Sequence, residues 1–397
     1  MSAILNARLL VADDNPDNRD VLIRRLRRLG YTRIESAEDG QQALDMNAAA
    51  PFDLVLLDVM MPRKSGVEVL EILRAEGRLE ATPVIMISAA TELDTVVRCL
   101  ELGAEDYLPK PFNPAVLKAR LGSVLEKRLL RAEVRQHLDR VDRELADARR
   151  QQLNMVPDVF PCPTGGLPVE VYASMHPARE VGGDFYDCFE VDSRTLCVAV
   201  GDVAGKGMPA ALFMARARSL LRSATLLLVR LLGRVPAPDE IATVVNEELC
   251  KNNPQCNFVT LFVGLLDTGT GTLRYLNAGH VRPYVLPHNA APFQLVCPAD
   301  VPLGFDPDFT FRAGTLTLAE GDSLVVVTDG VQDMTNVDDQ MFGGPATLAC
   351  LSNAADRRAA ALVGNLANTI FAFGQDTEQS DDVTILALRL GYGPGEE

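Results

Sequence analysis

The segment FDLVLLD at residues 52–58 is an apolar run that ends on an aspartate, and it sets the fold expected for the N-terminal part of the chain. A short apolar run of this kind is typical of a buried strand in a parallel sheet. Four similar runs, separated by segments whose apolar residues recur at helical spacing, are ARLLVA (7–12), TRIES (32–36), PVIMIS (83–88) and EDYLP (105–109). Alternating strands and helices predict an α/β domain with a doubly wound, five-stranded parallel sheet.

Polar side chains follow these runs. Ligands bind at the carboxyl ends of the strands in such sheets, and there the sequence places Asp13, Asp14, Asp58, Ser88 and Lys110. Three carboxylates form an oxygen-ligand site suited to Mg²⁺. A cation there would let Asp58, which ends the central run, attack a phosphoryl group as a nucleophile. Lys110 would pair with the phosphoryl oxygens, and Ser88 would donate a hydrogen bond to one of them.

With the Lys110-Pro111 step, these residues resemble the receiver domain of bacterial response regulators over about residues 6–125. The resemblance implies that a cognate sensor histidine kinase phosphorylates Asp58 and that the Lys110–Pro111 bond is cis. The Mg²⁺ ligands that it implies are Asp14, Asp58, the carbonyl of Met60 and, through water, Asp13. The switch pair that it implies is Ser88 and Tyr107, the hydroxyl moving toward the phosphoryl group as the ring turns inward.

From Asn113 the sequence predicts one long charged helix that reaches Leu153. Apolar residues at 134, 138, 141, 145 and 148 step 4-3-4-3, which is the spacing of a coiled-coil seam and favours a homodimer. Arg128 interrupts the phase upstream, so a solvated monomeric spacer stays an alternative. In the dimeric interpretation, the far end of this helix would press on a helical pair expected at 208–252.

A Pro/Gly-rich break, PDVFPCPTGGLP (157–168), marks the next boundary. The organisation expected is a receiver domain at 1–125, a helical linker at 126–156 and a second domain at 157–397. Beyond the break, alternating strands surround helical blocks expected near 208–232, 238–252 and 355–373. This pattern predicts an α+β sandwich of antiparallel sheets with flanking helices.

Four segments of the second domain place carboxylates beside glycines or at strand ends: REVGGDFYD (179–187), VGDVAGKGMPAAL (200–212), VVVTDGVQD (325–333) and QSDDVTIL (379–386). They contribute Asp184, Asp202, Asp329 and Asp381. Carboxylates that repel one another at close range need cations to coexist. An oxygen-rich site without Cys ligands favours Mg²⁺ or Mn²⁺ over Zn²⁺. Two such ions would activate a bridging water for attack on a phosphate.

These segments, with NAGHVRPYVL (277–286) and PLG (302–304), resemble the SpoIIE/RsbU-type branch of the metal-dependent (PPM-type) serine/threonine phosphatases over about 145–391. The metal ligands that the resemblance implies are Asp184, Asp202, the carbonyl of Val203, Asp329 and Asp381. Asp382 is the less suited acid of its pair, and His280 is expected to be structural. Arg179 has the spacing of a phosphate-binding arginine, although it also fits a surface position. The implied substrate is a phosphorylated anti-sigma-factor antagonist.

Composition excludes other classes. Acidic residues outnumber basic ones by 54 to 38, giving a net charge of −16, which argues against a nucleic-acid binder. Apolar runs such as SATLLLVRLLG (223–233) are broken by Arg, and no signal organisation opens the chain, so a cytoplasmic protein without membrane contact is expected. A non-catalytic adaptor that binds a partner after phosphorylation is the alternative function. The four aspartates favour the enzyme.

Overall fold

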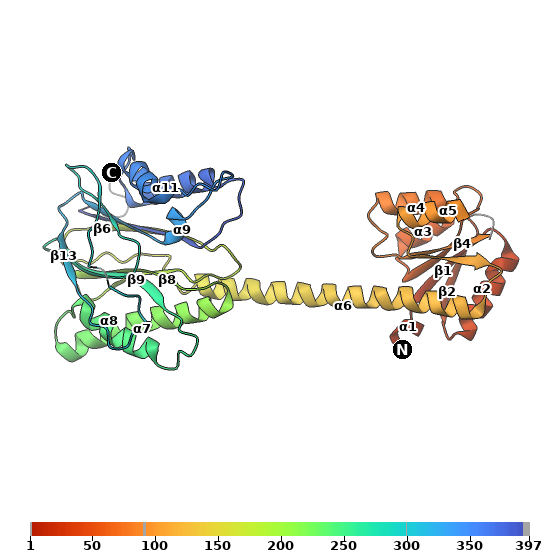
Figure 1. Cartoon of the computed structure of the whole chain (residues 1–397), viewed down its shortest axis with the longest axis horizontal. Coiled ribbons are helices and arrows are strands. Elements are labelled where there is room, and N and C mark those ends of the chain that lie inside the picture. Colours follow the sequence, from red (N-terminus) through yellow and green to blue (C-terminus); the bar gives the residue numbers. More distant parts are fainter. Residues whose placement is uncertain (1, 90–92, 299, 392–397) are drawn as a thin grey trace. The chain divides into compact units, whose positions relative to one another are not determined.

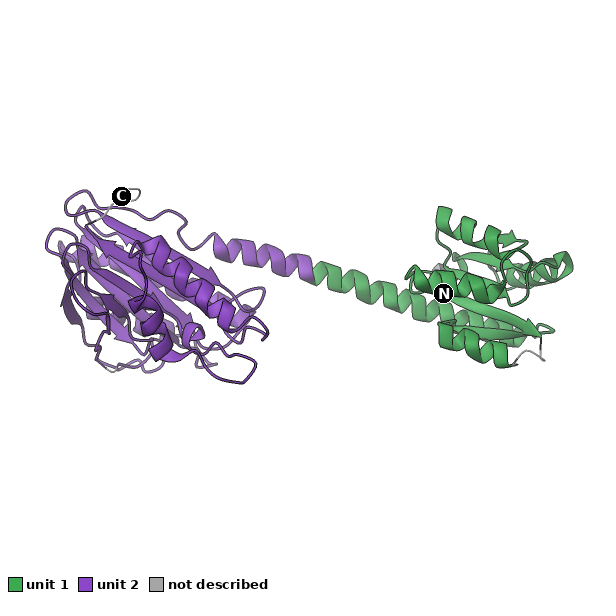
Figure 2. Ribbon diagram, turned by 90° about the horizontal axis from the view of Figure 1, so that it is seen from above, with its two compact units in different colours: residues 1–141 green, residues 142–397 purple. Residues whose placement is uncertain are grey.

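The computed structural model describes residues 2–89, 93–298 and 300–391, and the chain divides into two compact units, 1–141 and 142–397 (Figure 2). Each unit has a sheet architecture of its own (Figure 1). Among the described residues, no helix combines the length and the apolar character that crossing a membrane requires.

The first unit contains the predicted parallel sheet, with strand order β2-β1-β3-β4-β5. All four strand pairings are parallel. The strands are β1 (Arg8–Ala12), β2 (Arg33–Ala37), β3 (Leu54–Asp58), β4 (Val84–Ala89) and β5 (Asp106–Lys110). Each lies within two residues of the corresponding apolar run, which confirms the predicted doubly wound domain.

Helices cover both faces of this sheet because successive side chains of a buried strand point to opposite sides. Leu9 packs in one apolar cluster with α2 and the start of α6, whereas Leu10 packs in the other with α3 and α4. The helices are α1 (Ser2–Leu5), α2 (Pro16–Arg28), α3 (Gly40–Ala49), α4 (Gly66–Ala75) and α5 (Leu93–Leu102). A capping box between Ser65 and Glu68 begins α4.

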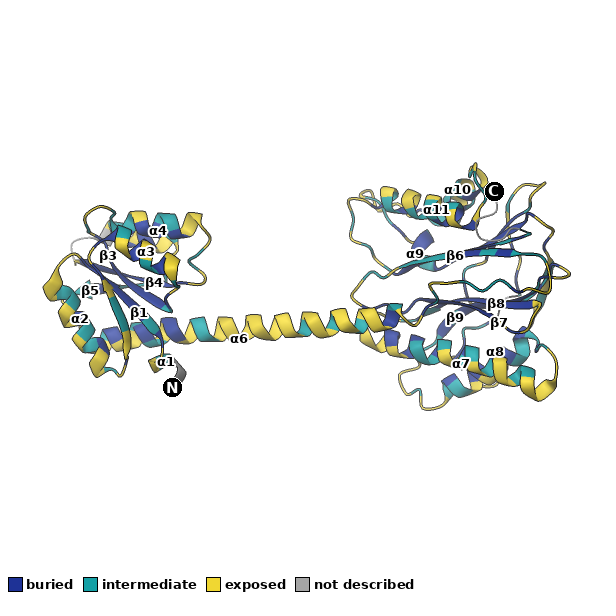
Figure 3. Ribbon diagram, turned by 180° about the vertical axis from the view of Figure 1, so that it is seen from behind, coloured by how far each residue is buried: buried dark blue, intermediate teal, exposed yellow. Residues whose placement is uncertain are grey.

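Helix α6 (Pro114–Leu153) has the predicted extent, and the Asn113 side chain caps its first turn by accepting from the amide of Ala115. Its first turns are buried in the core of the first unit through Leu117, Leu121, Val124 and Leu125. From 126 to 151 no residue is buried (Figure 3). The predicted seam residues Val134 and Leu138 are 60% and 55% exposed. This middle stretch therefore belongs to neither core.

The second unit is built on two antiparallel sheets, with strand orders β13-β10-β9-β8-β7 and β12-β11-β14-β15-β6. The strands are β6 (Val169–His176), β7 (Phe185–Glu190), β8 (Thr195–Val203), β9 (Val259–Asp267), β10 (Thr272–Ala278), β11 (Tyr284–Leu286), β12 (Phe293–Gln294), β13 (Gly314–Thr317), β14 (Ser323–Val327) and β15 (Val383–Leu390). Their inner faces share one apolar cluster, in which Phe262 of the first sheet and Leu386 of the second are fully buried. The predicted sandwich is confirmed.

Helices flank both sheets (Figure 1). The first sheet is covered by α7 (Met208–Leu232) and α8 (Pro238–Cys250), and the second carries α9 (Asp329–Gln332), α10 (Gly343–Ser352) and α11 (Ala359–Phe373). Gly233 ends α7 where expected, because its left-handed φ of 64° suits glycine and its amide bonds the carbonyl of Val229. The third predicted block is shorter than expected, since α11 begins only at Ala359. The short α9 and α10 were not predicted.

Candidate functional sites

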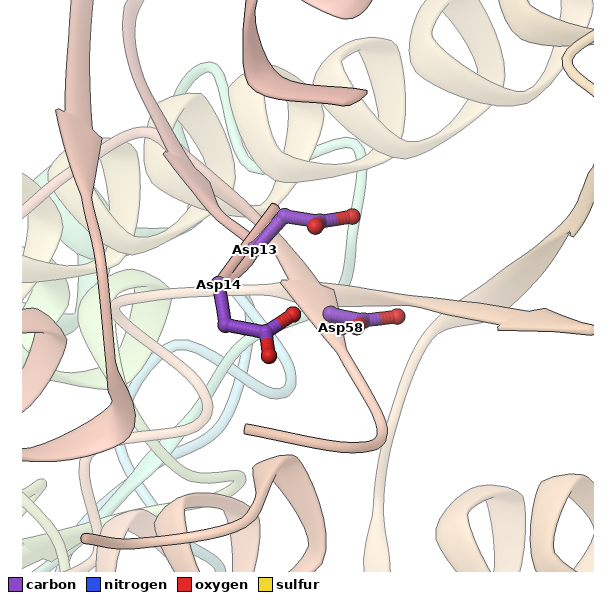
Figure 4. A group of neighbouring side chains, drawn as sticks. All are labelled: Asp13, Asp14 and Asp58. Carbon is purple, nitrogen blue, oxygen red and sulfur yellow. The ribbon is translucent and has the colours of Figure 1, made fainter. Parts of the chain in front are cut away.

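The first candidate site lies at the carboxyl edge of the parallel sheet. Asp13 follows β1 directly and Asp58 is the last residue of β3, and these two strands are hydrogen-bonded neighbours. Ligand oxygens of Asp13, Asp14 and Asp58 all lie within 4.8 Å of one another (Figure 4). Asp13 and Asp58 are buried, whereas Asp14 is exposed. The structure thus brings together the three predicted carboxylates.

Lys110, the last residue of β5, lies against this cluster. Its Nζ is 2.8 Å from Oδ1 of Asp58 and 2.9 Å from Oδ2 of Asp13. Burial nevertheless raises the pKa of Asp58 to about 6. The hydrogen bond from Lys110 opposes this shift, and the charges of Asp13 and Asp14 add smaller contributions that raise the pKa further. A divalent cation would favour the charged carboxylate, and an all-oxygen donor set suits Mg²⁺. The residues present therefore fit the implied ion.

The predicted switch residues lie on β4, which neighbours β3, and on β5, which neighbours β4 at the edge of the sheet. Ser88 is buried near the end of β4, and Tyr107 is half-buried on the neighbouring β5. The guanidinium of Arg120, on α6, lies 5.6 Å from the centre of the Tyr107 ring and donates to both carboxylate oxygens of Asp106. Met60 has an exposed side chain two residues beyond Asp58, and the Lys110–Pro111 bond is cis, as predicted.

The second candidate site lies at one edge of the sandwich and gathers the other four aspartates. Asp184 directly precedes β7 and Asp202 is next to last in β8; Asp329 opens α9 just after β14, and Asp381 lies just before β15. Because β7 pairs antiparallel with β8, and β14 with β15, the start of one strand lies beside the end of its neighbour. Asp184 therefore lies beside Asp202, and Asp329 lies near Asp381. A hydrogen bond from Thr328, which precedes Asp329, to Asp184 brings the two pairs to the same edge of the sandwich.

Burial and mutual repulsion dominate the electrostatics of this site. The pKa of Asp184, which is 2% exposed, is raised well above its ordinary range by burial and then by Asp202 and Asp382. Burial, followed by repulsion from Asp329, Asp381 and Asp382, raises the pKa of Asp202 to about 7. The pKa of Asp329 is also raised, first by burial and then by Asp381. An oxygen-rich, strongly acidic cluster of this kind fits divalent cations.

Two side chains that were not predicted hold members of this cluster. The hydroxyl of Thr328 donates to Oδ2 of Asp184 at 2.8 Å and thereby joins the two sheets. The Nζ of Lys206 lies 3.1 Å from Oδ2 of Asp381 and also donates to the carbonyl of Ser380. Thr328 is the first residue of the TDG turn, and a residue pattern alone does not show that its hydroxyl faces across the sandwich.

Asp382 supports the backbone. One of its carboxylate oxygens accepts from the amides of Gly183 and Asp184, at 2.6 and 3.4 Å, and the other accepts from the amide of Ala178 at 2.8 Å. A carboxylate bound by three backbone amides has little capacity left for a metal. This geometry supports the choice of Asp381 as the ligand of the pair.

The remaining predicted residues lie around the cluster. Val203 is buried, and its carbonyl approaches Gly183 so closely that a Cβ there would lie 2.8 Å from it. Arg179 is exposed in the loop between β6 and β7 that also carries Asp184. His280 is buried and bonded through Nδ1 to the hydroxyl of Thr260, and burial lowers its pKa to about 3. A neutral, enclosed imidazole fits the structural role expected for it.

The comparisons with known proteins agree with this division. The family description "Stage II sporulation protein E (SpoIIE)" matches residues 192–391, and "Response regulator receiver domain" matches residues 9–122. Protein IcfG of Synechocystis sp. is 28% identical over 296 residues, which are 66% of this chain and 43% of that protein. The transcriptional regulatory protein CpxR of Escherichia coli is 46% identical over 121 residues, which are 30% of this chain and 50% of that protein.

The chain thus spans half or less of the length of these two curated relatives. Among solved structures, the SiaA-PP2C domain of Pseudomonas aeruginosa superposes with a TM-score of 0.55 at 21% identity, covering 64% of this chain and 98% of that domain. This likeness shows that the second unit has the PP2C fold. The chain belongs to the SpoIIE family, and it carries a response regulator receiver domain ahead of its PP2C-type phosphatase fold.

Proposed function

We propose that this protein is a two-component response regulator whose output is a metal-dependent protein serine/threonine phosphatase. The observation that carries the proposal is the edge of the sandwich where Asp184, Asp202, Asp329 and Asp381 meet. Family membership supports the same activity. A non-catalytic adaptor would gain nothing from gathering four carboxylates at one edge, where burial and mutual repulsion raise the pKa values of Asp184, Asp202 and Asp329, so the cluster favours the enzyme over the adaptor.

The metal ligands proposed for the second unit are Asp184, Asp202, the carbonyl of Val203, Asp329 and Asp381. They would hold two Mn²⁺ or Mg²⁺ ions, which supply an activated water and neutralise charge on the phosphoryl oxygens. Thr328 fixes the orientation of Asp184, and Asp382 fixes the backbone at Gly183 and at Asp184 itself. Arg179 would bind the substrate phosphate as a bidentate donor from the exposed loop.

In the receiver domain, Asp58 would accept the phosphoryl group from a cognate sensor histidine kinase. Its proposed Mg²⁺ ligands are Asp13, Asp14, Asp58 and the carbonyl of Met60. Lys110 already contacts Asp58 and is placed to neutralise the phosphoryl oxygens. Ser88 and Tyr107 would then respond as a switch pair. Because the guanidinium of Arg120 on α6 lies against the Tyr107 ring, a movement of the ring would change a contact made by that helix.

The proposed substrate is a phosphorylated anti-sigma-factor antagonist, which would place the protein in a cytoplasmic partner-switching pathway. We propose domain limits of 1–125 for the receiver, 126–156 for the linker and 157–397 for the phosphatase. The exposed apolar residues of α6, including Val134 and Leu138, support a homodimer formed through the linker. The acidic net charge supports a function without nucleic acid or membrane.

The test is release of phosphate from the phosphorylated antagonist as a function of Mn²⁺, before and after treatment of the full chain with acetyl phosphate. Turnover that requires Mn²⁺ and changes with labelling of Asp58 is expected. Asp58→Ala should remove both the label and the response while leaving Mn²⁺-dependent turnover. Binding of the antagonist without turnover at any Mn²⁺ concentration would establish the adaptor instead.

A further inference from the structure

The C-terminal end of α6 makes a buried contact with the second candidate site. Gln152 is 5% exposed, and it is the first buried residue after Leu125. Its neighbour Gln151 is exposed, although the two side chains are chemically identical. A buried amide in an otherwise solvated stretch of helix needs partners for both its donor and its acceptor.

Gln152 finds both partners on a single residue. Its Nε2 donates to the carbonyl of Gly182 at 2.6 Å, and its Oε1 accepts from the amide of Gly182 at 3.1 Å. The side-chain amide therefore binds the backbone as a neighbouring β-strand would. Glutamate could not reproduce the pair, because an ionised carboxylate only accepts hydrogen bonds.

Gly182 belongs to the loop that delivers Asp184. On its other side this loop is held by Asp382, which accepts from the amides of Gly183 and Asp184. Gly182 packs directly against that carboxylate, where the Cβ of any other residue would collide with it. Two side chains consequently hold the loop that carries Asp184 by hydrogen bonds to its backbone: Asp382 from within the sandwich and Gln152 from α6.

The turn after α6 adds two further anchors at the same place. Val156 is buried in the core of the second unit, and the carbonyl of Pro157 accepts from the hydroxyl of Tyr186 at 3.3 Å. Tyr186 lies two residues after Asp184 on β7. Residues 152–157 therefore follow the backbone of 182–186, and a change in how α6 ends is transmitted to Asp184 without passing through α7 or α8.

We propose that Gln152 is a positioning residue through which α6 sets the metal affinity of the Asp184 site and through which the linker acts on it. The proposal rests on the proposed function, since it concerns the metal of that same site. It differs from the expected action of the linker on the 208–252 helices, because the contact is made directly with the loop that carries a predicted ligand.

The variant that tests it is Gln152→Met in the full chain, which keeps the length of the side chain and removes both hydrogen bonds. Gln152→Glu is a second variant that keeps the acceptor and loses the donor, and Gln151→Ala is the matched control. Calorimetry with Mn²⁺ alone gives the affinity of the chain for the ion. Because the receiver site would also bind Mn²⁺, the same titration of Asp184→Asn, in which the second site is impaired, gives the receiver's contribution to be subtracted. Hydrogen exchange of peptides that cover 178–186 reports the order of the loop.

Gln152→Met is expected to weaken Mn²⁺ binding at the second site about 10-fold, as loss of a group that orients a ligand commonly does, and to speed exchange in 178–186. Gln152→Glu should follow it, and Gln151→Ala should match wild type. Acetyl phosphate should shift Mn²⁺ affinity in wild type but not in Gln152→Met. Unchanged affinity and exchange in Gln152→Met, a wild type without Mn²⁺ bound at the second site, or a phosphorylation-dependent shift that persists in the variant would each overturn the proposal.

Failure of the proposed function has a different signature. A wild-type chain that binds Mn²⁺ at the second site yet releases no phosphate from any phosphoserine protein would refute the phosphatase. The calorimetry and the exchange experiment would still decide the role of Gln152, because neither of them depends on turnover.

Discussion

The two carboxylate sites differ in how much of their charge the protein itself neutralises. In the first unit, Lys110 contacts two of the three aspartates within 3 Å. In the second unit, Lys206 contacts Asp381 from a half-exposed position, and the pKa values of the other three predicted ligands are raised. A site whose negative charge is partly neutralised by a lysine side chain suits chemistry on one of its own carboxylates. A site left strongly acidic suits the retention of divalent ions that act on an external phosphate.

The sharpest way to break this comparison is to remove one charge from the second site. Asp202→Asn should lower Mn²⁺-dependent phosphatase activity on the order of 10²- to 10³-fold, the usual cost of losing one preorganised electrostatic group. Steady-state release of phosphate from the phospho-antagonist measures it, with hydrogen exchange of β9 and β14 peptides, compared with wild type, as the control for folding of the second unit. Near wild-type turnover would show that the cluster does not bind the catalytic metals.

A pH experiment sharpens the comparison from the other side. The folded-state pKa of Asp58, about 6, lies above its ordinary value of 3.8. The folded state therefore favours the protonated carboxyl of Asp58. Its contribution to the free energy of unfolding is fully present below about pH 4 and is lost as the pH rises through 6. The full loss is on the order of 3 kcal/mol. Asp58→Asn cannot ionise, so in EDTA at pH 7.5 it should unfold with a free energy up to about 3 kcal/mol higher than wild type.

Hydrogen exchange of β3 and β4 peptides in a urea series reports this difference for the first unit alone. At pH 4 the two proteins should agree closely, and Mg²⁺ should restore wild-type stability at pH 7.5 because the ion replaces the proton. A wild type in EDTA that is as stable as Asp58→Asn at pH 7.5 would mean that Lys110 fully compensates the buried charge.

In the proposed function, the first site acts on the second through α6. Leu138→Asp with Leu145→Asp places charges on the predicted seam, so light scattering should show monomers. The response to phosphorylation, expected at about 5- to 150-fold for a coupling of this kind, should disappear. Gln136→Asp with Ala146→Asp adds the same charges off the seam and should leave both properties unchanged. A dimer that still responds after the seam change would leave direct contact between domains as the means of regulation.

The smallest expected effect tests whether Lys206 competes with the metal. Its removal takes a positive charge away from Asp381, and an interaction of about 1 kcal/mol at a partly exposed position corresponds to roughly 5-fold tighter Mn²⁺ binding in Lys206→Gln. Calorimetry measures it, and Lys251→Gln, an exposed lysine paired with Glu248 at the end of α8, is the control. Weaker Mn²⁺ binding would show that Lys206 orients Asp381 for the ion.

The sequence predicted the parallel sheet, the antiparallel sandwich and both aspartate clusters because the signals are local. A buried strand needs an apolar run, and a strand end exposes whatever polar residue follows it. The exact placement of Asp329 was less accessible, since the four-residue α9 that begins with it is too short to give a periodic pattern. Two neighbouring residues of the same type were also hard to tell apart. Asp381 and Asp382 differ only in which of them faces the backbone amides of a loop about two hundred residues away in the sequence.

Gln152 is a clearer example of a functional contact that local sequence patterns do not predict. Gln151 and Gln152 form an identical pair in a charged helix, and only the packing of the loop at 182–184 decides which of them is buried. Contacts made between distant segments leave no periodic trace in the chain. Thr328 and Lys206 escaped prediction for this reason, although both lie within motifs that were found, VVVTDGVQD (325–333) and VGDVAGKGMPAAL (200–212).

The exposed middle of α6 has a consequence for the amount of protein in the cell. Between 126 and 151 the helix has no buried side chain, while Val134 and Leu138 present apolar surface to water. Burying that surface against a second copy is a bimolecular event, so mass action governs it. Two short heptads give a modest association constant. At low occupancy, doubling the copy number of the protein would then nearly double the paired fraction and nearly quadruple the concentration of dimer. The expression level of the protein would then regulate it alongside the kinase, because a change in transcription would change the fraction of chains that are paired through α6.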